Sequence, residues 1–130
     1  MALVELVVLD ASAVLAWLRG ETGGEKLRPY LSQCLMSLVN YAEVRQRFWR
    51  DNINPAPYFE IFEATPVQLL SPDRDQARDA GDLERLTKPI GASLADRFCL
   101  GLALSRNLPV VTTDKPWDRL GLPLDIRQLR

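Results

Sequence analysis

Four acidic residues are placed where they could bind divalent metal together: Asp10, Glu43, Asp96 and Asp114. Asp10 interrupts the otherwise apolar run VVLDASAVLAWL at residues 7–18. A carboxylate in such surroundings is costly unless it is neutralised or paired with a cation. Carboxylate oxygens without histidine or cysteine ligands favour hard ions such as Mg²⁺ or Mn²⁺. These acids are therefore candidate metal ligands and catalytic residues.

The composition narrows the chemistry that is open to the chain. Its 130 residues include no histidine, which excludes Ser-His and Cys-His catalysis and histidine-ligated zinc. The net charge of −1 excludes a strong overall positive field, so a nucleic-acid partner must be met by local basic residues or metal ions. Cys34 and Cys99 are expected to be small buried hydrophobes in a reducing compartment. With neither a signal peptide nor a membrane span expected, the sequence predicts one cytoplasmic domain over 1–130.

Strand-like and helix-like segments alternate along the chain, which predicts an α/β fold with a mainly parallel sheet of four to five strands flanked by helices. Strands are predicted at 3–9, 34–37, 67–70 and 108–113, with a possible edge strand at 124–129. Helices are predicted at 11–18, 24–31, 38–51, 54–64, from 71 onward, at 93–107 and, as a short turn, at 115–120.

This alternation brings the four acids to one edge of the sheet. In a right-handed βαβ unit the helix runs antiparallel to its strands, so each helix begins where the strands end. Asp10 and Asp114 follow predicted strands, while Glu43 and Asp96 lie near the starts of predicted helices. We therefore expect all four at the edge where open α/β sheets bind ligands.

Each acid, taken alone, also has an ordinary structural explanation. These are a helix cap for Asp10 and for Asp114, an i,i+4 ion pair with Arg47 for Glu43, and a capping box with Ser93 for Asp96. Together, however, carboxylates at one edge repel each other by about 4 kcal/mol per pair at 4 Å and an effective dielectric near 20. Such a cluster normally holds a proton or a cation, which favours the metal site.

Four segments resemble the PIN domain, and most closely the toxin ribonucleases of VapBC toxin–antitoxin pairs. They are VLDASAVLAWL (8–18), SLVNYAEV (37–44), ASLADRFCLGLAL (92–104) and VVTTDKPWDRL (110–120). The resemblance implies a three-layer sandwich and a Mg²⁺- or Mn²⁺-dependent endoribonuclease that hydrolyses phosphodiesters by metal-assisted attack of water. It also implies that the four acids bind the metal, that a cognate antitoxin neutralises the enzyme, and that the chain forms a homodimer.

The resemblance assigns further residues around the acids. Ser12 and Thr112 match hydroxyls that support the metal-binding carboxylates, and Asp118 falls where some members place an additional acid, although it also suits a surface helix. Candidate RNA-binding residues near the acidic edge are Arg45, Arg47, Arg50, Arg97 and Lys115, for each of which a solvated position or a salt bridge is the alternative.

Aromatic residues leave two interpretations open. Trp49 and Trp117 could stack on unpaired bases or pack within the fold. An apolar cluster at Tyr58, Phe59, Ile61 and Phe62 could be a docking surface or part of the core.

Three other functions compete with the ribonuclease. A receiver-type phosphoacceptor also gathers acids at this edge, but the acidic pair after the first strand is missing. A haloacid-dehalogenase-type phosphatase is disfavoured because the segment DAS at 10–12 lacks the second aspartate of a D-x-D signature. A catalytically inactive PIN-like module that binds RNA or protein remains the third alternative.

Overall fold

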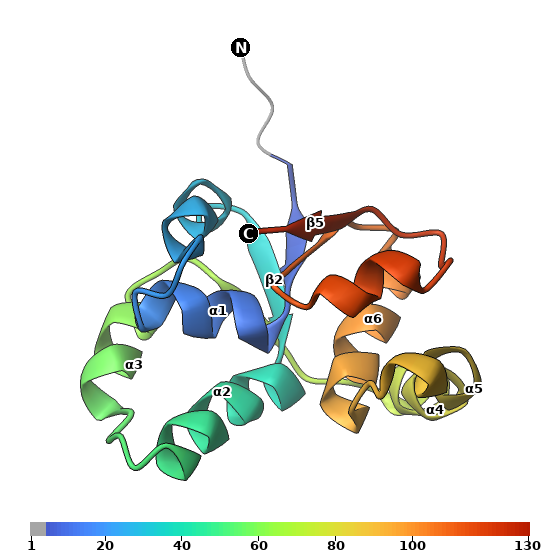
Figure 1. Ribbon diagram of the computed structural model, residues 1–130, viewed down its shortest axis with the longest axis horizontal. Coiled ribbons are helices and arrows are strands. Elements are labelled where there is room, and N and C mark those ends of the chain that lie inside the picture. Colours follow the sequence, from blue (N-terminus) through green and yellow to red (C-terminus); the bar gives the residue numbers. More distant parts are fainter. Residues whose placement is uncertain (1–4) are drawn as a thin grey trace.

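The computed structural model describes residues 5–130 (Figure 1). In this range five parallel strands form one sheet in the order β3-β2-β1-β4-β5. They are β1 (Val7–Leu9), β2 (Cys34–Ser37), β3 (Gln68–Leu70), β4 (Val110–Thr112) and β5 (Ile126–Gln128). The predicted α/β fold with a parallel sheet is confirmed. The predicted first strand began at residue 3, and residues 3 and 4 lie outside the described residues.

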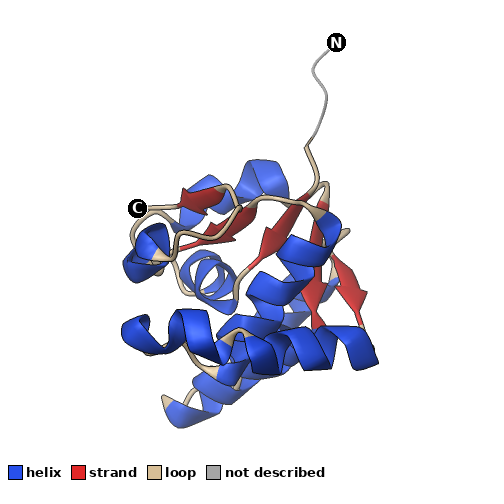
Figure 2. Cartoon of the chain, turned by 90° about the vertical axis from the view of Figure 1, so that its right-hand side faces the viewer, coloured by secondary structure: helices blue, strands red, loops and turns tan. Residues whose placement is uncertain are grey.

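Helices cover both faces of the sheet, giving three layers (Figures 1 and 2). One face carries α1 (Ala11–Leu18), the 3₁₀ helix η1 (Gly24–Tyr30), α2 (Leu38–Arg50) and α3 (Ala56–Glu63). The other carries α4 (Arg74–Asp82), α5 (Glu84–Thr87) and α6 (Leu94–Arg106), with the 3₁₀ turns η2 (Lys88–Ile90) and η3 (Lys115–Arg119) nearby. Among residues 5–130, no helix combines the length and the apolar character that crossing a membrane requires.

The central strand β1 explains why the sheet has two cores. Val7, Val8 and Leu9 are all fully buried, as expected for a parallel strand covered on both faces. Because successive side chains of a strand point to opposite faces, Val7 and Leu9 join the core beneath α1–α3 while Val8 joins the core beneath α6. The continuous apolar run of the sequence is thus divided between two layers.

One predicted helix deviates from its expected boundaries for local reasons. The helix predicted from 71 begins at Arg74, because the Asp73 side chain caps it by accepting a hydrogen bond from the Gln76 N–H. It gives way to α5 after Gly81 and Asp82, two weak helix formers. The remaining helices agree with the prediction to within a few residues at each end.

The strand order places a topological switch point in the middle of the sheet. From β1 the chain builds outward to β2 and β3, then crosses to β4 and β5 on the other side of β1. The crevice at the carboxyl ends of β1 and β4 is the place where open α/β sheets usually bind ligands. Asp10 follows β1 directly, and Asp114 comes two residues after β4.

Candidate active site

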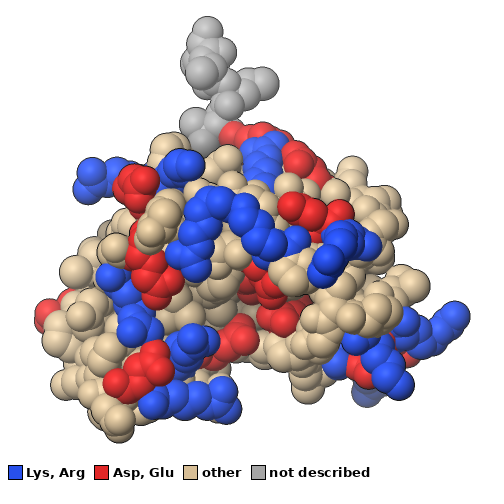
Figure 3. All heavy atoms as spheres, in the orientation of Figure 1, with Lys and Arg blue, Asp and Glu red and all other residues tan. Residues whose placement is uncertain are grey.

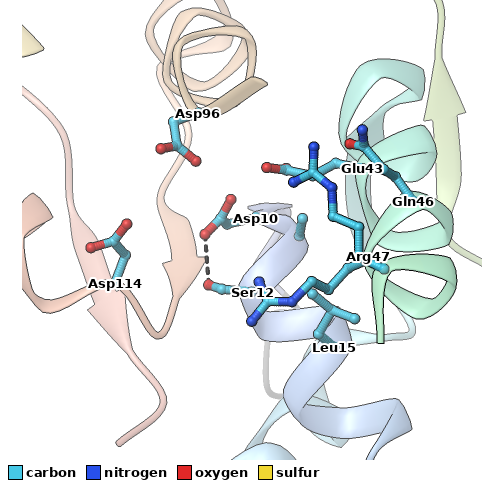
Figure 4. A pocket seen from close by; sticks show the side chains of 10 residues that line it. Asp10, Ser12, Leu15, Glu43, Gln46, Arg47, Asp96 and Asp114 are labelled. Atoms are coloured by element: carbon cyan, nitrogen blue, oxygen red, sulfur yellow. Dashed lines mark hydrogen bonds between the residues drawn. The ribbon is translucent and has the colours of Figure 1, made fainter. Parts of the chain in front are cut away.

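Three carboxylates meet at this crevice: Asp10 after β1, Glu43 in the second turn of α2 and Asp96 in the first turn of α6. Each offers one oxygen that lies within 4.8 Å of the others. Figure 4 shows the three side chains pointing toward a common space, with Asp114 to one side. All four acids line one pocket of about 210 Å³, and Figure 3 shows acidic atoms in a hollow near the middle of this face, with basic side chains around it.

Asp10 is held by two hydroxyl groups. Its side chain is buried, and its Oδ2 accepts hydrogen bonds from Ser12 Oγ at 2.6 Å and Thr112 Oγ1 at 2.8 Å. Ser12 Oγ also accepts a hydrogen bond from the Thr113 N–H at 3.0 Å, which ties the start of α1 to the end of β4. Asp10 occupies the N-cap position of α1, but its side chain makes no capping hydrogen bond to the helix, so side-chain capping does not account for the carboxylate.

Burial and repulsion by neighbouring carboxylates disfavour the ionised forms of Asp10 and Glu43. Burial raises the pKa of Asp10 to about 7; the carboxylates of Asp96 and Glu43 add to the rise, and the hydrogen bonds from Ser12 and Thr112 oppose it. Burial likewise raises the pKa of Glu43. Among residues 5–130, no lysine or arginine forms a salt bridge with Asp10, Glu43 or Asp96. A compact set of oxygen donors that makes no salt bridge fits a divalent cation.

The structural explanations considered for Glu43 and Asp96 differ in outcome. Glu43 makes no ion pair with Arg47, whose Nε lies 3.5 Å from Asp51 Oδ2 instead. The capping box of Asp96 is present: Ser93 Oγ accepts from the Asp96 N–H, and the Ser93 N–H donates to Asp96 Oδ2 at 2.9 Å. Asp96 therefore caps α6 and belongs to the carboxylate cluster at the same time.

Asp114 and Asp118 lie at different distances from the cluster. Asp114 lines the pocket, but it is not one of the three acids that meet within 4.8 Å. Burial raises its pKa, and the nearby Asp96 carboxylate contributes. Asp114 is the N-cap residue of η3, as the alternative expected, but its side chain makes no capping hydrogen bond. Asp118 is exposed outside the pocket, where its Oδ1 accepts a hydrogen bond from Gln128 Nε2 at 3.2 Å.

A family model identifies the family of this chain. The model of the PIN domain matches residues 7–122. The chain belongs to the PIN domain family. This membership sets aside the receiver-type and dehalogenase-type alternatives. No curated protein matches the chain by sequence.

Solved structures share the fold of this PIN domain at low sequence identity. A toxin–antitoxin complex from Klebsiella pneumoniae superposes with a TM-score of 0.72 at 17% identity, over 95% of this chain and 98% of that one. DNA-bound VapBC from Salmonella typhimurium gives 0.71 at 18%, over 98% and 100%. The Mycobacterium tuberculosis toxin VapC20, described as cleaving the sarcin–ricin loop, gives 0.73 at 13%, over 89% and 95%.

The basic residues predicted to bind RNA differ in their access to the pocket of this PIN domain. Arg47 and Arg50 on α2 are exposed and line it. Lys115 is exposed but does not line it. Arg47 and Arg50 are therefore the candidates placed to meet a polyanion at the acids.

Arg45 and Arg97 are engaged elsewhere. The Arg45 guanidinium lies 4.5 Å from the centre of the Phe59 ring, a cation–π contact between α2 and α3. Arg97 is largely buried, pairs with Glu84 and donates from Nε to Thr87 Oγ1 at 3.2 Å. These contacts agree with the salt-bridge alternative for Arg97, since they tie the start of α6 to α5.

Trp49 and Trp117 differ in burial. Trp117 is fully buried against α6 and packs in the core, so the base-stacking interpretation is wrong for it. Trp49 is 59% exposed and stays a candidate for stacking.

Cys34 and Cys99 are buried free thiols, as predicted, and burial raises the pKa of Cys34 to about 11.

The apolar cluster on α3 is mostly core. Phe59 and Phe62 are buried, and the rings of Tyr41 and Phe59 make an edge-to-face contact with centroids 5.2 Å apart. Tyr58 packs against the same core, whereas Ile61 is 57% exposed. Ile61 is therefore the one strongly exposed apolar side chain of this cluster that a docking partner could contact.

A residue that had not been predicted lies beside the carboxylates. Asn40, in the first turn of α2, is fully buried. Its Nδ2 donates to Glu43 Oε1 at 3.3 Å and to the Ala95 carbonyl at 2.9 Å. The signal in the sequence is the i,i+3 spacing to Glu43, which places both residues on one helix face.

Proposed function

We propose that this PIN domain is a metal-dependent endoribonuclease and the toxin of a type II toxin–antitoxin pair. The observation that carries the proposal is the meeting of three carboxylates, from the sheet edge and from both helical layers, around the buried Asp10. The fold shared with VapBC complexes and with a toxin described as cleaving the sarcin–ricin loop supports the same activity. RNA as substrate follows from this family likeness and not from the pocket alone.

Asp10, Glu43 and Asp96 would hold one Mg²⁺ or Mn²⁺ ion, with Asp114 available at the side of the same pocket. When bound, the ion supplies positive charge that favours ionised Asp10 and polarises a phosphodiester toward attack by water. Ser12 and Thr112 both donate to Asp10 Oδ2, which fixes the orientation of the carboxylate. Their hydrogen bonds also stabilise its ionised form, the form a cation requires.

Residues at the rim of the pocket would bind the substrate. Arg47 and Arg50 would contact phosphate oxygens on either side of the bond that is cut, and the exposed Trp49 nearby on α2 could stack on a base. Because the net charge is −1, long-range attraction of RNA is weak and these local contacts must supply the affinity.

We further propose a cognate antitoxin and a second copy of the chain as protein partners, and the cytoplasm as the compartment.

The test is cleavage of a single-stranded, fluorophore-quencher RNA by the purified protein. We expect cleavage in Mg²⁺ or Mn²⁺, none in EDTA, and recovery when metal is restored. Asp96→Asn should abolish the activity, while the matched control Asp75→Asn, an exposed acid on α4, should retain it. Cleavage that persists in EDTA would disprove the metal role, and absence of cleavage with any divalent ion would favour the inactive RNA- or protein-binding module.

A further inference from the structure

We propose that Asn40 is a positioning residue of the metal site: its amide group holds Glu43 and the start of α6 so that the carboxylates stay at chelating distance. This inference rests on the proposed metal-dependent function. Asn40 is fully buried, and its Nδ2 reaches both Glu43 Oε1 and the Ala95 carbonyl. Asp96 follows Ala95 directly, so one amide group acts on two of the three metal-binding acids.

The orientation of the amide follows from its partners. A carboxylate oxygen and a backbone carbonyl are both acceptors, so the NH₂ group of Asn40 must face them, and each of its two protons has one acceptor. The Oδ1 atom then points into the interior, where it finds no hydrogen-bond partner among the described residues. A buried acceptor without a partner lowers stability. Stability alone therefore gives a weak reason for asparagine at this position.

The link opposes a force that the site itself creates. Glu43 belongs to the helical layer on one face of the sheet and Asp96 to the layer on the other. Without a cation, their carboxylates, whose oxygens lie within 4.8 Å of one another, repel each other. A hydrogen bond from α2 to the backbone of α6 keeps the two helix starts together, while the bond to Oε1 limits the rotamers open to Glu43. The site is thereby preorganised for the ion.

The decisive variant is Asn40→Leu, which keeps the branched shape and approximate volume but removes the donor and the unpaired acceptor. Mn²⁺ affinity is measured by electron paramagnetic resonance of the free ion, and the melting temperature is measured in EDTA. We expect the Mn²⁺ dissociation constant to rise about tenfold or more, whether or not the melting temperature falls, because the variant also leaves Glu43 Oε1 and the Ala95 carbonyl without their donor. A residue that only stabilised the fold would lower the melting temperature and leave Mn²⁺ affinity unchanged.

Two further variants guard this result. Asn40→Ala, which cannot clash with its neighbours, should weaken Mn²⁺ binding to a similar extent, and this would show that loss of the amide, and not distortion by leucine, causes the effect. Ser105→Ala is the matched control on α6: it removes a hydrogen bond of 2.9 Å to the Leu102 carbonyl, far along the helix from Asp96. This control should leave Mn²⁺ affinity at the wild-type value.

Kinetics supply an independent readout. In RNA cleavage by Asn40→Leu, the half-saturating Mn²⁺ concentration should rise by the same factor as the dissociation constant, and kcat at saturating Mn²⁺ should recover to within about threefold of wild type. If the wild type binds Mn²⁺ and both Asn40 variants bind it with the same affinity, the positioning role is overturned and the proposed function stands. A wild-type protein that binds no Mn²⁺ would overturn both.

Discussion

Replacing Asp10 by asparagine should stabilise the metal-free protein at alkaline pH, although it destroys the candidate active site. Asparagine can accept the hydrogen bonds of Ser12 and Thr112 through Oδ1, and its NH₂ group can donate toward Glu43 and Asp96. The substitution removes a buried negative charge from a cluster in which no basic side chain of residues 5–130 forms a salt bridge with it. The gain in stability comes from that charge.

The magnitude follows from the pKa of Asp10, which lies at about 7 in the folded protein against an ordinary value of 3.8. At 1.4 kcal/mol per pKa unit, ionising Asp10 in the folded state costs about 4 kcal/mol more than in the unfolded state. Because the folded pKa is raised, the wild type loses this stability as the pH climbs from 3.8 through 7. Asp10→Asn should thus gain about 4 kcal/mol at pH 8, less than half of that at pH 5, and almost nothing below pH 4.

The assay is thermal unfolding of both proteins in EDTA at several pH values. About 4 kcal/mol in a domain of this size raises the melting temperature on the order of 10 °C. Addition of Mn²⁺ should reverse the order at pH 8, because only the wild type binds the ion and is stabilised by it. A melting temperature for Asp10→Asn that is equal to or below the wild type at pH 8, or a gain that does not change with pH, would refute the reasoning.

Three further outcomes are expected. Asp96→Asn should abolish RNA cleavage but leave the far-UV circular dichroism unchanged, because its amide oxygen can still accept from the Ser93 N–H in the capping box; residual cleavage would remove Asp96 from the reaction. Thr112→Val removes a hydrogen bond that lowers the pKa of Asp10, so that pKa should rise and Mn²⁺ affinity should fall about tenfold in a titration; unchanged affinity would show that Ser12 suffices. Neither thiol of the native protein should react with Ellman's reagent before unfolding, because burial raises the pKa of both; rapid labelling of the folded chain would contradict the packing.

The convergence of the acids was predictable because it depends on topology and not on side-chain detail. Asp10 ends an apolar strand, and Glu43 and Asp96 lie in the first two turns of helices that follow the strand edge. In a parallel α/β sheet these positions meet whatever the surrounding residues are. The same argument placed Asp114 in the pocket, but the sequence could not show that it stands apart from the closest three.

Contacts that depend on how two helices pack were not predictable. Asn40 reaches the Ala95 carbonyl only because α2 and α6 approach each other across the sheet edge, a distance that no local pattern encodes. Arg97 lies one residue after Asp96, yet its guanidinium turns to Glu84 and Thr87, since a long side chain can reach any of several acceptors. Such choices are settled by tertiary packing.

The position of the cluster over the edge of the sheet has a dynamic consequence. An ion held by Glu43 and Asp96 would link the two helical layers to each other. The Asn40 amide already makes such a link, by its hydrogen bond to Ala95, 55 residues later in the sequence. Backbone amides at the beginnings of α2 and α6 would then exchange their hydrogens with solvent more slowly as a pair when the ion binds. Transient separation of the two helical layers and dissociation of the ion would then occur together. The lifetime of the bound ion would therefore measure how often the two layers separate.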